Sequence, residues 1–370
     1  MMELTALDVH YAVRELSTLV GARLDKIVQS DTDKRDVLFT LSHNHREGKM
    51  HLRFLLPHML CAHDEKPTHY PQIPPGFAMF LRKYIGGIRL ESVTQRGFDR
   101  VIDLRFRGKT GTWTLVVEML APGNMILVGD DGKIKNLLEN QHYKDRSLRG
   151  GLAYEAPPAA FNIVTASDAE MTTRIKDALR GNAAAALATA LGLGGAYAME
   201  VCARAGIENE ATLSETDIEK LVIATRALLD HPIAPHRDEH RVWPFLLTTK
   251  PATPCVQATF LAALGSAVES HEAKELHTPT VSTGKPKKSK LQVMLDAQEA
   301  NLIALERVAQ DQSVVADRIY EEYALVADVI GTAQTARKEK ADVAHALKRI
   351  TAVKRYDTAT ATAELEFTDR

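Results

Sequence analysis

A charged turn between two expected strands brings together more paired charges and structural signals than any other stretch of the chain. Residues 95–98 (QRGF) predict a turn, and Asp99 and Arg100 follow it at the start of an alternating strand. An arginine can donate two hydrogen bonds to a phosphate or a base edge, and a carboxylate can accept from a base amine or orient the arginine. The alternative is an ordinary salt bridge at the start of a strand, since surface ion pairs are common.

A second acidic candidate lies near the N-terminus. Residues 5–20 predict a helix with one apolar stripe, which Thr5 can cap and Gly21 ends, and Asp8 falls in its first turn. A carboxylate there complements the helix dipole and the free backbone N–H groups. The same side chain could instead be offered to a ligand, and the sequence leaves both roles open.

Basic residues also lie before and after the charged turn in the sequence. A short helix is predicted over residues 77–84, and Gly86 and Gly87 stop it. The segment 133–149 is rich in cations and is either a phosphate-facing edge or a solvated loop. Candidate contacts to a nucleic-acid backbone in these regions are Arg82, Lys83, Arg89, Arg96, Lys144 and Arg146.

A glycine-rich turn offers a different route to a phosphate. Residues 191–195 (LGLGG) separate an alanine-rich helix over 183–190 from a second helix that Gly206 ends, which is the pattern of a helix-hairpin-helix. Gly192 and Gly194 allow a tight turn, and the second helix then presents free N–H groups to a phosphate. The alternative is a plain turn between two packed helices, because few cations surround it.

Metal and redox chemistry have weak support. His58, Cys61, His63 and His69 lie in an expected loop, but their spacing lacks the ligand pairs of structural zinc sites. We expect no metal and no cofactor. The three cysteines form no C-x-x-C pair, the N-terminus lacks the apolar run of a signal peptide, and no stretch of 18 apolar residues exists. These features predict a cytoplasmic protein with no membrane contact.

Hydrophobic periodicity predicts an α+β fold with a mostly antiparallel sheet. Strands over 22–29, 36–42 and 49–56 alternate with one solvated face, and a meander follows from residue 89 to about 137. Capping boxes at 167–170 and 212–215 open helices. A short strand over 241–248 and an apolar helix over 258–268, which returns to the first domain, complete this part.

The 370 residues predict several domains, and the last part differs from the rest. We expect an N-terminal domain over 1–166 that continues at about 232–280, a helix-hairpin-helix domain over 167–231 and a linker over 281–289. A coiled-coil arm helix over 290–347 follows, about 80 Å long at 1.5 Å per residue, and needs a partner for its apolar stripe. Residues 348–370 predict a hairpin around 355–357 at the tip of the arm.

These motifs together resemble the NFACT family of ribosome quality-control factors, in an archaeal-type version. The matching residues are 7–9 with 14–16, 77–83 with Gly87, 95–100, 123–124, Arg146 with Gly151 and 154–157, 191–195, and the long helix. The resemblance implies that the family's functional Asp-Arg pair corresponds to Asp99 and Arg100, and its early functional aspartate to Asp8. It also implies an N-terminal domain similar to that of formamidopyrimidine-DNA glycosylases.

The function implied by this resemblance is tRNA binding on the ribosome. Such proteins bind the large (50S) ribosomal subunit with a stalled nascent chain-tRNA, and recruit aminoacyl-tRNA, here alanyl-tRNA, for untemplated tailing of the nascent chain. Peptide-bond formation stays with the ribosomal RNA, so the protein is not itself an enzyme. The net charge of -2 is compatible, because RNA is read largely through unpaired loops and backbone.

Two other functions compete with this one. Some relatives carry a fibronectin-binding label, which suggests an adhesin or a coiled-coil scaffold. A base-excision glycosylase would need an N-terminal proline amine as nucleophile, whereas Met2 and Glu3 stand here. Family members continue into a return helix and a further RNA-associated domain, so we expect this chain to be a fragment, a split gene product or a reduced homologue. A second chain or a missing C-terminal half would then pair with the arm.

Overall fold

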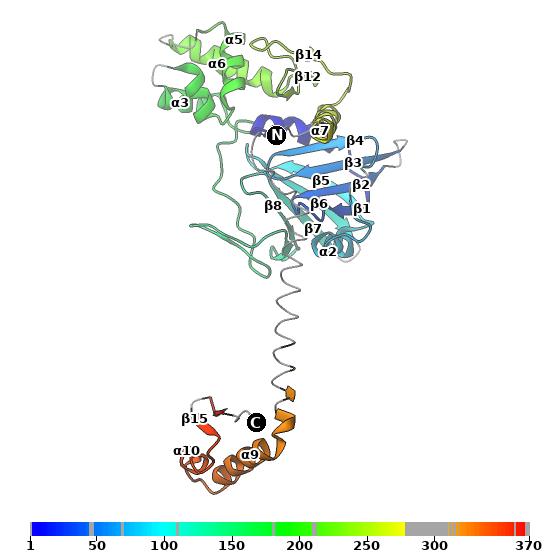
Figure 1. The fold of residues 1–370 in the computed structure, drawn as a ribbon. Helices are drawn as coiled ribbons and strands as arrows, with labels where there is room; N and C mark the ends of the chain where they lie inside the picture. The colour runs from blue at the N-terminus through cyan, green and yellow to red at the C-terminus, as the bar shows by residue number, and fades with distance from the viewer. Residues whose placement is uncertain are drawn as a thin grey trace. The chain divides into compact units, whose positions relative to one another are not determined.

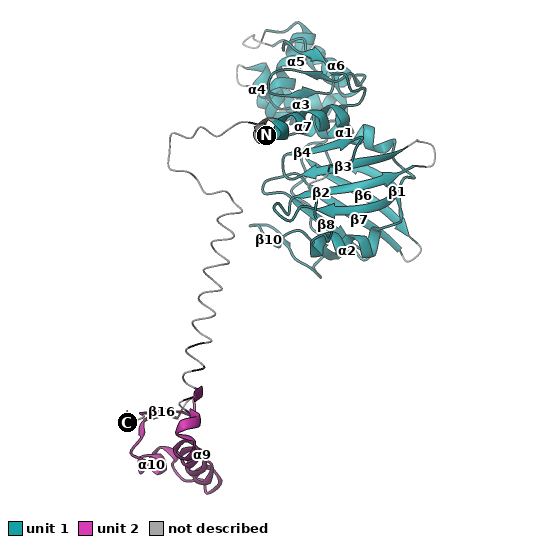
Figure 2. Ribbon diagram, turned by 45° about the vertical axis from the view of Figure 1, so that its right-hand side comes forward, with its two compact units in different colours: residues 1–278 teal, residues 279–370 magenta. Residues whose placement is uncertain are grey.

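A computed structural model describes residues 2–43, 48–67, 70–108, 111–179, 182–208, 213–277, 310, 313, 316–317, 319–358 and 360–366. The chain divides into two compact units, Met1–Thr278 and Pro279–Arg370 (Figure 2). The predicted linker over 281–289 lies outside the described residues, and the finer division at residues 166 and 231 stays a prediction.

The first unit is built on an antiparallel sheet of nine strands, in the order β4-β3-β2-β1-β5-β6-β7-β8-β9 (Figure 1). Two meanders meet where β1 pairs with β5 at Arg23 and Arg89. The predicted antiparallel sheet is therefore confirmed. The strands are β1 (Arg23–Gln29), β2 (Asp36–Ser42), β3 (Lys49–Leu55), β4 (Met59–His63), β5 (Arg89–Gln95), β6 (Val101–Gly108), β7 (Gly111–Glu118), β8 (Asn124–Val128) and β9 (Ile134–Leu137).

The expectation of one solvated sheet face is wrong for β2 and for most of β3. All but the last residue of β2, and the last five residues of β3, are buried. Leu38 points away from the main core and packs in a small cluster with Val28 and Tyr70. The Tyr70 hydroxyl donates to Asp36 Oδ1 at 2.5 Å, so the segment before α2 (Gly76–Ile85) covers this face.

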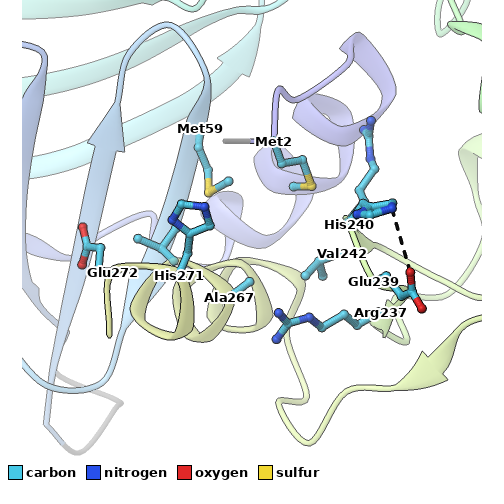
Figure 3. A pocket seen from close by; sticks show the side chains of 11 residues that line it. Met2, Met59, Arg237, Glu239, His240, Val242, Ala267, His271 and Glu272 are labelled. Carbon is cyan, nitrogen blue, oxygen red and sulfur yellow. Dashed lines mark ion pairs between the residues drawn. The ribbon is translucent and has the colours of Figure 1, made fainter. Parts of the chain in front are cut away.

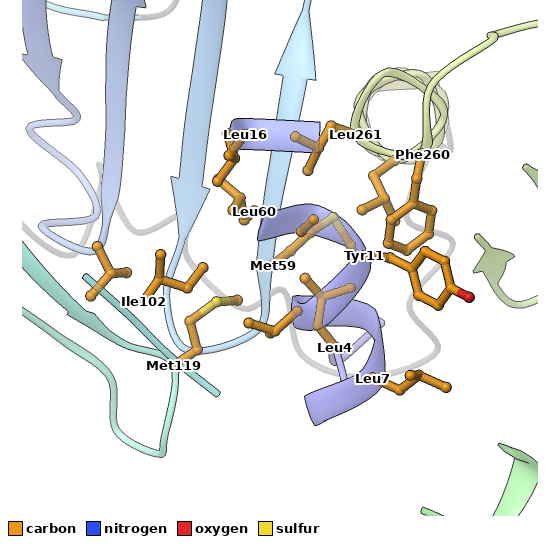
Figure 4. Close-up of a cluster of buried hydrophobic side chains, with 14 of the residues drawn as sticks. Leu4, Leu7, Tyr11, Leu16, Met59, Leu60, Ile102, Met119, Phe260 and Leu261 are labelled. Atoms are coloured by element: carbon orange, nitrogen blue, oxygen red, sulfur yellow. The ribbon is translucent and has the colours of Figure 1, made fainter. Parts of the chain in front are cut away.

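Helices α1 and α7 cover one end of the sheet and complete the core (Figure 4). Side chains of α1, including Leu7 and Tyr11, meet Met59 and Leu60 of β4 in one buried cluster. The Glu15 carboxylate of α1 accepts from the Phe260 N–H at 2.5 Å and the Leu261 N–H at 2.9 Å, which fixes the start of α7. The apolar helix expected over 258–268 is thus α7, which begins at Phe260 and packs against α1 and β4. The helices of this unit are α1 (Ala6–Ser17), α2 (Gly76–Ile85), α3 (Asp168–Ala178), α4 (Ala183–Ala190), α5 (Gly195–Ala205), α6 (Glu215–Leu229) and α7 (Phe260–His277).

The helices α3 to α6 pack as a group, and the start of α6 differs from the expectation. The capping box at Ser167 forms as predicted. The second box joins Ser214 to Asp217, not the residues 212–215, because Ser214 directly precedes the first turn of α6. The short strand expected over 241–248 is only two residues long. The short strands are β10 (Gln141–His142), β11 (Ser147–Leu148), β12 (His236–Arg237), β13 (Val242–Trp243) and β14 (Thr253–Pro254).

The second unit contains α9 (Tyr323–Lys338), α10 (Val343–Leu347), β15 (Val353–Asp357) and β16 (Thr362–Leu365). The arm helix predicted over 290–347 is interrupted, although residues 290–309 lie outside the described part. Helix α9 ends at Lys338, Lys340 has a positive φ of 54°, and Asp342 caps α10 through the Ala344 N–H at 2.9 Å. Strands β15 and β16 pair within the expected hairpin region, but residues 355–357 lie in β15 and not in the turn.

Candidate nucleic-acid interface

Three segments that are distant in sequence meet beside the N-terminus of α1. They are residues 3–8, the turn 95–100 between β5 and β6, and the turn 191–195 between α4 and α5. The Gln95 side-chain amide donates to the Ala6 carbonyl and to the Asp99 carbonyl, at 2.8 Å each. This bridge holds the β5–β6 turn against α1 and so fixes the backbone beside Asp99 and Arg100.

Asp99 and Arg100 are both half-buried and have different partners. The Asp99 Oδ1 accepts from the Arg100 N–H at 2.7 Å, which closes the turn. The Arg100 guanidinium forms an ion pair with Glu3, and its hydrogen bond holds the pKa of that carboxyl below its usual value. The ion pair expected at this turn therefore exists, but it joins Arg100 to Glu3. The Glu3 side chain is 49% exposed, so this pair lies at the surface where an RNA could compete for Arg100.

Asp8 is fully buried and serves as an acceptor for the protein itself. It receives the Thr5 N–H and the Thr5 hydroxyl at 2.7 Å each, and the Tyr197 hydroxyl at 2.5 Å. Arg241 completes the set with an ion pair. Burial, and then the charge of Asp8, raise the pKa of Tyr197 well above its usual value. Of the two roles left open, the structure gives Asp8 the capping role. Because its side chain is fully buried and bonded within the protein, it does not contact a ligand directly in this arrangement.

The α4–α5 turn lies against both neighbouring segments. Gly192 and Gly194 have positive φ values of 69° and 74°, a region that favours glycine. A Cβ at Gly192 would lie 3.7 Å from the Phe98 ring, and one at Gly194 would lie 3.6 Å from the Thr5 methyl. Gly194 offers no side chain to cap α5. The first backbone N–H groups of α5 therefore remain for another acceptor. Gly192 thus lies beside the turn that carries Asp99 and Arg100, and Gly194 lies beside the N-cap residue of α1.

A buried polar network supports the other side of this turn. Arg96 pairs with Asp103 at 2.6 Å, and its guanidinium stacks over the Tyr154 ring at 5.2 Å. The Tyr154 hydroxyl donates to Glu118 at 2.8 Å. Burial raises the pKa of Asp103, although Arg96 acts in the opposite direction. Arg96 therefore stabilises the turn and is also partly exposed, at 37% of its side chain.

The assignment of Arg146 as a surface contact is wrong. Its guanidinium donates two hydrogen bonds to Glu118, at 2.6 and 2.8 Å, and the two side chains are 8% and 1% exposed. A buried acid requires a partner, and this requirement places Arg146 inside. Lys144, two residues earlier, is exposed between β10 and β11.

The remaining predicted cations lie away from the turn. The Arg82 side chain donates to the Ile27 carbonyl at 2.7 Å, and Arg89 donates to the Gly21 carbonyl at 2.6 Å. Lys83 is exposed on α2. Arg89 begins β5, whereas the charged turn follows the last residue of that strand. We therefore assign these three residues to a separate surface.

The residues that sequence reasoning missed are Glu3, Tyr197 and Arg241. Tyr197 and Arg241 meet Asp8 across separations of 189 and 233 residues. No local spacing could indicate such contacts. Glu3 had a visible signal, because it is an acid five residues before Asp8, but its partner Arg100 is 97 residues away.

The cysteine and histidine candidates have structural roles. Cys61 and His63 lie in β4 rather than in a loop. Complete burial raises the pKa of the Cys61 thiol to about 12. His63 contacts Glu269 of α7 at 2.6 Å, and His69 lies outside the described residues. Within the described ranges, no group of three acidic, histidine or cysteine side chains could hold a metal ion.

The match to known families decides the relationship. The pattern of NFACT N-terminal and middle domains matches residues 5–349. The chain belongs to the NFACT family. It is 28% identical to an archaeal Rqc2 homologue from Methanocaldococcus jannaschii, over 94% of this chain and 54% of that protein. A ribosome quality control complex subunit NEMF homologue from Drosophila melanogaster is 30% identical over 40% of this chain and 15% of that protein. This NFACT chain therefore spans about half the length, or less, of these curated relatives.

Two solved structures share the fold of the first unit. One is the N-terminal part of a fibronectin/fibrinogen-binding protein from Streptococcus suis, with a TM-score of 0.59 and 21% identity over 74% of this chain and all of that one. The other is a fibrinogen-binding protein from Staphylococcus aureus, with a TM-score of 0.54 and 21% identity over 68% of this chain and 95% of that one. At this identity the likeness shows the fold alone.

Among the helices that the structure describes, none is both long enough and apolar enough to cross a membrane.

Proposed function

We propose that this NFACT chain is a ribosome quality-control factor of the cytoplasm. It binds the large (50S) ribosomal subunit that carries a stalled nascent chain-tRNA, and it recruits aminoacyl-tRNA, specifically alanyl-tRNA, for untemplated tailing. Peptide-bond formation is left to the ribosome, and the turn at Asp99 and Arg100 supplies groups that suit contact with RNA.

The convergence at the N-terminus of α1 carries this proposal. Arg100 lies at the surface with an exposed acid as its partner, and the uncapped start of α5 adds backbone donors nearby. A guanidinium and free N–H groups together are well suited to a phosphate or an unpaired base. The names of the archaeal and fly relatives support the same role.

Sedimentation with purified 50S subunits tests the proposal. We expect Arg100→Ala to weaken binding of subunits with peptidyl-tRNA, and of tRNA alone, by about tenfold, since a bidentate arginine contact is worth ~1–3 kcal/mol. Arg107→Ala is the matched control, because it removes an exposed arginine near the opposite end of β6. If the unmodified protein ignores both the subunit and tRNA, the proposal fails.

Adhesion to fibrinogen or fibronectin is the second candidate, and it is favoured only by the descriptions of the two solved structures. The same variants distinguish it. Tight binding to either host protein that persists in Arg100→Ala, together with no binding to ribosomes, would favour adhesion. Base-excision chemistry would be revived by a borohydride-trapped DNA adduct.

A further inference from the structure

A small pocket lies next to the Asp8–Arg241 pair, at the junction of α7, β4 and the β12–β13 hairpin (Figure 3). Its volume is about 230 Å³. This is below the roughly 300–1,000 Å³ of pockets that enclose drug-sized ligands, so the space suits a group as small as one base.

The pocket has an apolar floor. Met2 and Met59 reach it from the N-terminal segment and from the start of β4, and Ala267 of α7 lies opposite them (Figure 3). Val242 of β13 adds a branched side chain. Thioether and aliphatic groups are adaptable and polarizable, and they make favourable contacts with flat aromatic rings.

The rim of the pocket carries a second arginine, Arg237, in addition to Arg241. Arg237 extends from β12 toward α7 (Figure 3), and among the described residues its guanidinium has no hydrogen bond or ion pair. Neither acid of the rim forms an ion pair with Arg237: Glu272 lies 2.8 Å from Arg53, which also pairs with Asp36, and Glu239 is 93% exposed beside His240. Arg237 is therefore the group of the rim that can contact a phosphate.

The pocket is connected to the candidate RNA surface through two residues. Met2 lines the pocket and precedes Glu3, the partner of Arg100. Arg241 also lines the pocket, and one of its nitrogens binds Asp8 while its buried Nε has no partner. An RNA strand that crosses Arg100 can therefore reach the pocket within a few nucleotides.

We propose that this pocket binds one unpaired nucleotide of the RNA held at the Asp99–Arg100 turn, an inference that rests on the proposed function. The base lies on Met2 and Met59, and its phosphate contacts Arg237. Proteins that read single-stranded RNA commonly combine a base-stacking floor with a cation at the backbone.

The test uses the full chain labelled with ¹³C at the methionine methyl groups. Adenosine 5′-monophosphate is the probe, and inorganic phosphate is the comparison. We expect the nucleotide to shift the Met2 and Met59 signals, assigned through Met2→Leu and Met59→Leu, because an aromatic ring would lie beside them. The half-exposed Met79 and Met199 serve as internal controls and stay unchanged. Phosphate alone leaves all four signals in place.

Two substitutions test the individual contacts. Arg237→Gln should weaken nucleotide binding about fivefold, whereas the matched Arg107→Gln should not change it. Ala267→Phe fills the pocket and should abolish the shifts at Met2 and Met59, and a thermal melt verifies that this variant folds. An acidic peptide that produces the shifts when the nucleotide does not would overturn the proposal.

A single-stranded heptanucleotide separates this proposal from the proposed function. If Arg100→Ala weakens its binding while the Met2 and Met59 signals never move, the pocket is overturned and the RNA surface stands. If the nucleotide shifts those signals but the chain ignores 50S subunits and tRNA, the pocket stands and the proposed function fails.

Discussion

Asp8 shows how one residue can matter for an RNA surface without touching RNA. Its carboxylate is fully buried and accepts hydrogen bonds from Thr5, Tyr197 and Arg241. These partners belong to α1, α5 and the segment before β13, so one charge joins three parts of the first unit. Loss of Asp8 would therefore displace the α4–α5 turn from its place beside Arg100.

We predict that Asp8→Asn lowers the free energy of unfolding by about 3 kcal/mol, because Arg241 loses its charge partner in a largely buried site. Denaturant unfolding measures this change. Asp99→Asn is the matched control and should change stability by less than about 0.5 kcal/mol, since that side chain is half-exposed. An Asp8→Asn protein of normal stability that no longer binds RNA would restore the ligand role of Asp8.

Sequence reasoning at this scale predicted the turn before β6 but not the burial of the charged side chains around it. Asp99 and Arg100 could be chosen because a turn signal and a paired charge coincide in six residues. Arg146 could not be placed, because the acid that buries it, Glu118, is 28 residues away at the end of β7. Long-range ion pairs leave no periodic signal, so a charged residue expected at the surface can be internal.

Among the elements, the α4–α5 turn depends most on backbone conformation. Gly194 has a φ of 74° and precedes α5, whereas the adjacent Gly195 has ordinary φ and open space around its Cα. Substitution by alanine should therefore change the free energy of unfolding differently at Gly194 and at Gly195.

We expect Gly194→Ala to destabilise the protein by about 1 kcal/mol, because a left-handed conformation is strained for alanine. Gly195→Ala should be neutral or slightly stabilising at the first position of α5. Thermal unfolding of the two variants gives the comparison. Equal effects of both substitutions would show that the turn can adopt another conformation.

The contact between α1 and α6 predicts a dependence on pH. The His10 ring nitrogen Nε2 lies 3.2 Å from the Leu229 carbonyl oxygen, and burial lowers the pKa of His10 below 6.5. At pH values between 6.5, the pKa of His10 in the unfolded chain, and its lower pKa in the folded chain, the unfolded chain therefore binds more protons than the folded chain. The free energy of unfolding should therefore fall as the pH drops from about 6.5 into that range.

His10→Gln removes the titrating group and tests this assignment. The variant should lose part of the pH dependence below about 6.5, measured by urea unfolding at several pH values. If the two proteins show the same slope of stability against pH, another group is responsible.

Most elements of the first unit could be predicted, because their signals are local. The alternation of Val37, Phe39 and Leu41 identified β2, and Gly206 identified the end of α5 in a left-handed cap. The burial of both faces of β2 could not be predicted, since it depends on Tyr70, which covers Leu38 from a segment of irregular structure. The break after Lys338 was also missed, because no proline marks it and the cap at Asp342 is a weak signal within a long apolar repeat.

At the scale of the whole molecule, every described residue of the candidate interface belongs to the first unit. The three converging segments, the polar network at Glu118 and the nucleotide pocket all lie within Met1–Thr278. The second unit has its own small set of buried side chains, which includes Val329, Ala336 and Leu347. RNA binding at Arg100 and the function of the second unit should therefore be separable.

We predict that residues 1–278 alone fold cooperatively and bind a single-stranded heptanucleotide within about a factor of two of the full chain, because each unit has its own core. A single unfolding transition in denaturant checks the first part, and fluorescence anisotropy with labelled RNA checks the second. The same protein with Arg100→Ala is the control and should lose affinity by the same factor as in the full chain. A shortened protein that folds but binds RNA more than about tenfold more weakly would place part of the RNA surface, worth ~1.4 kcal/mol, in residues 279–370.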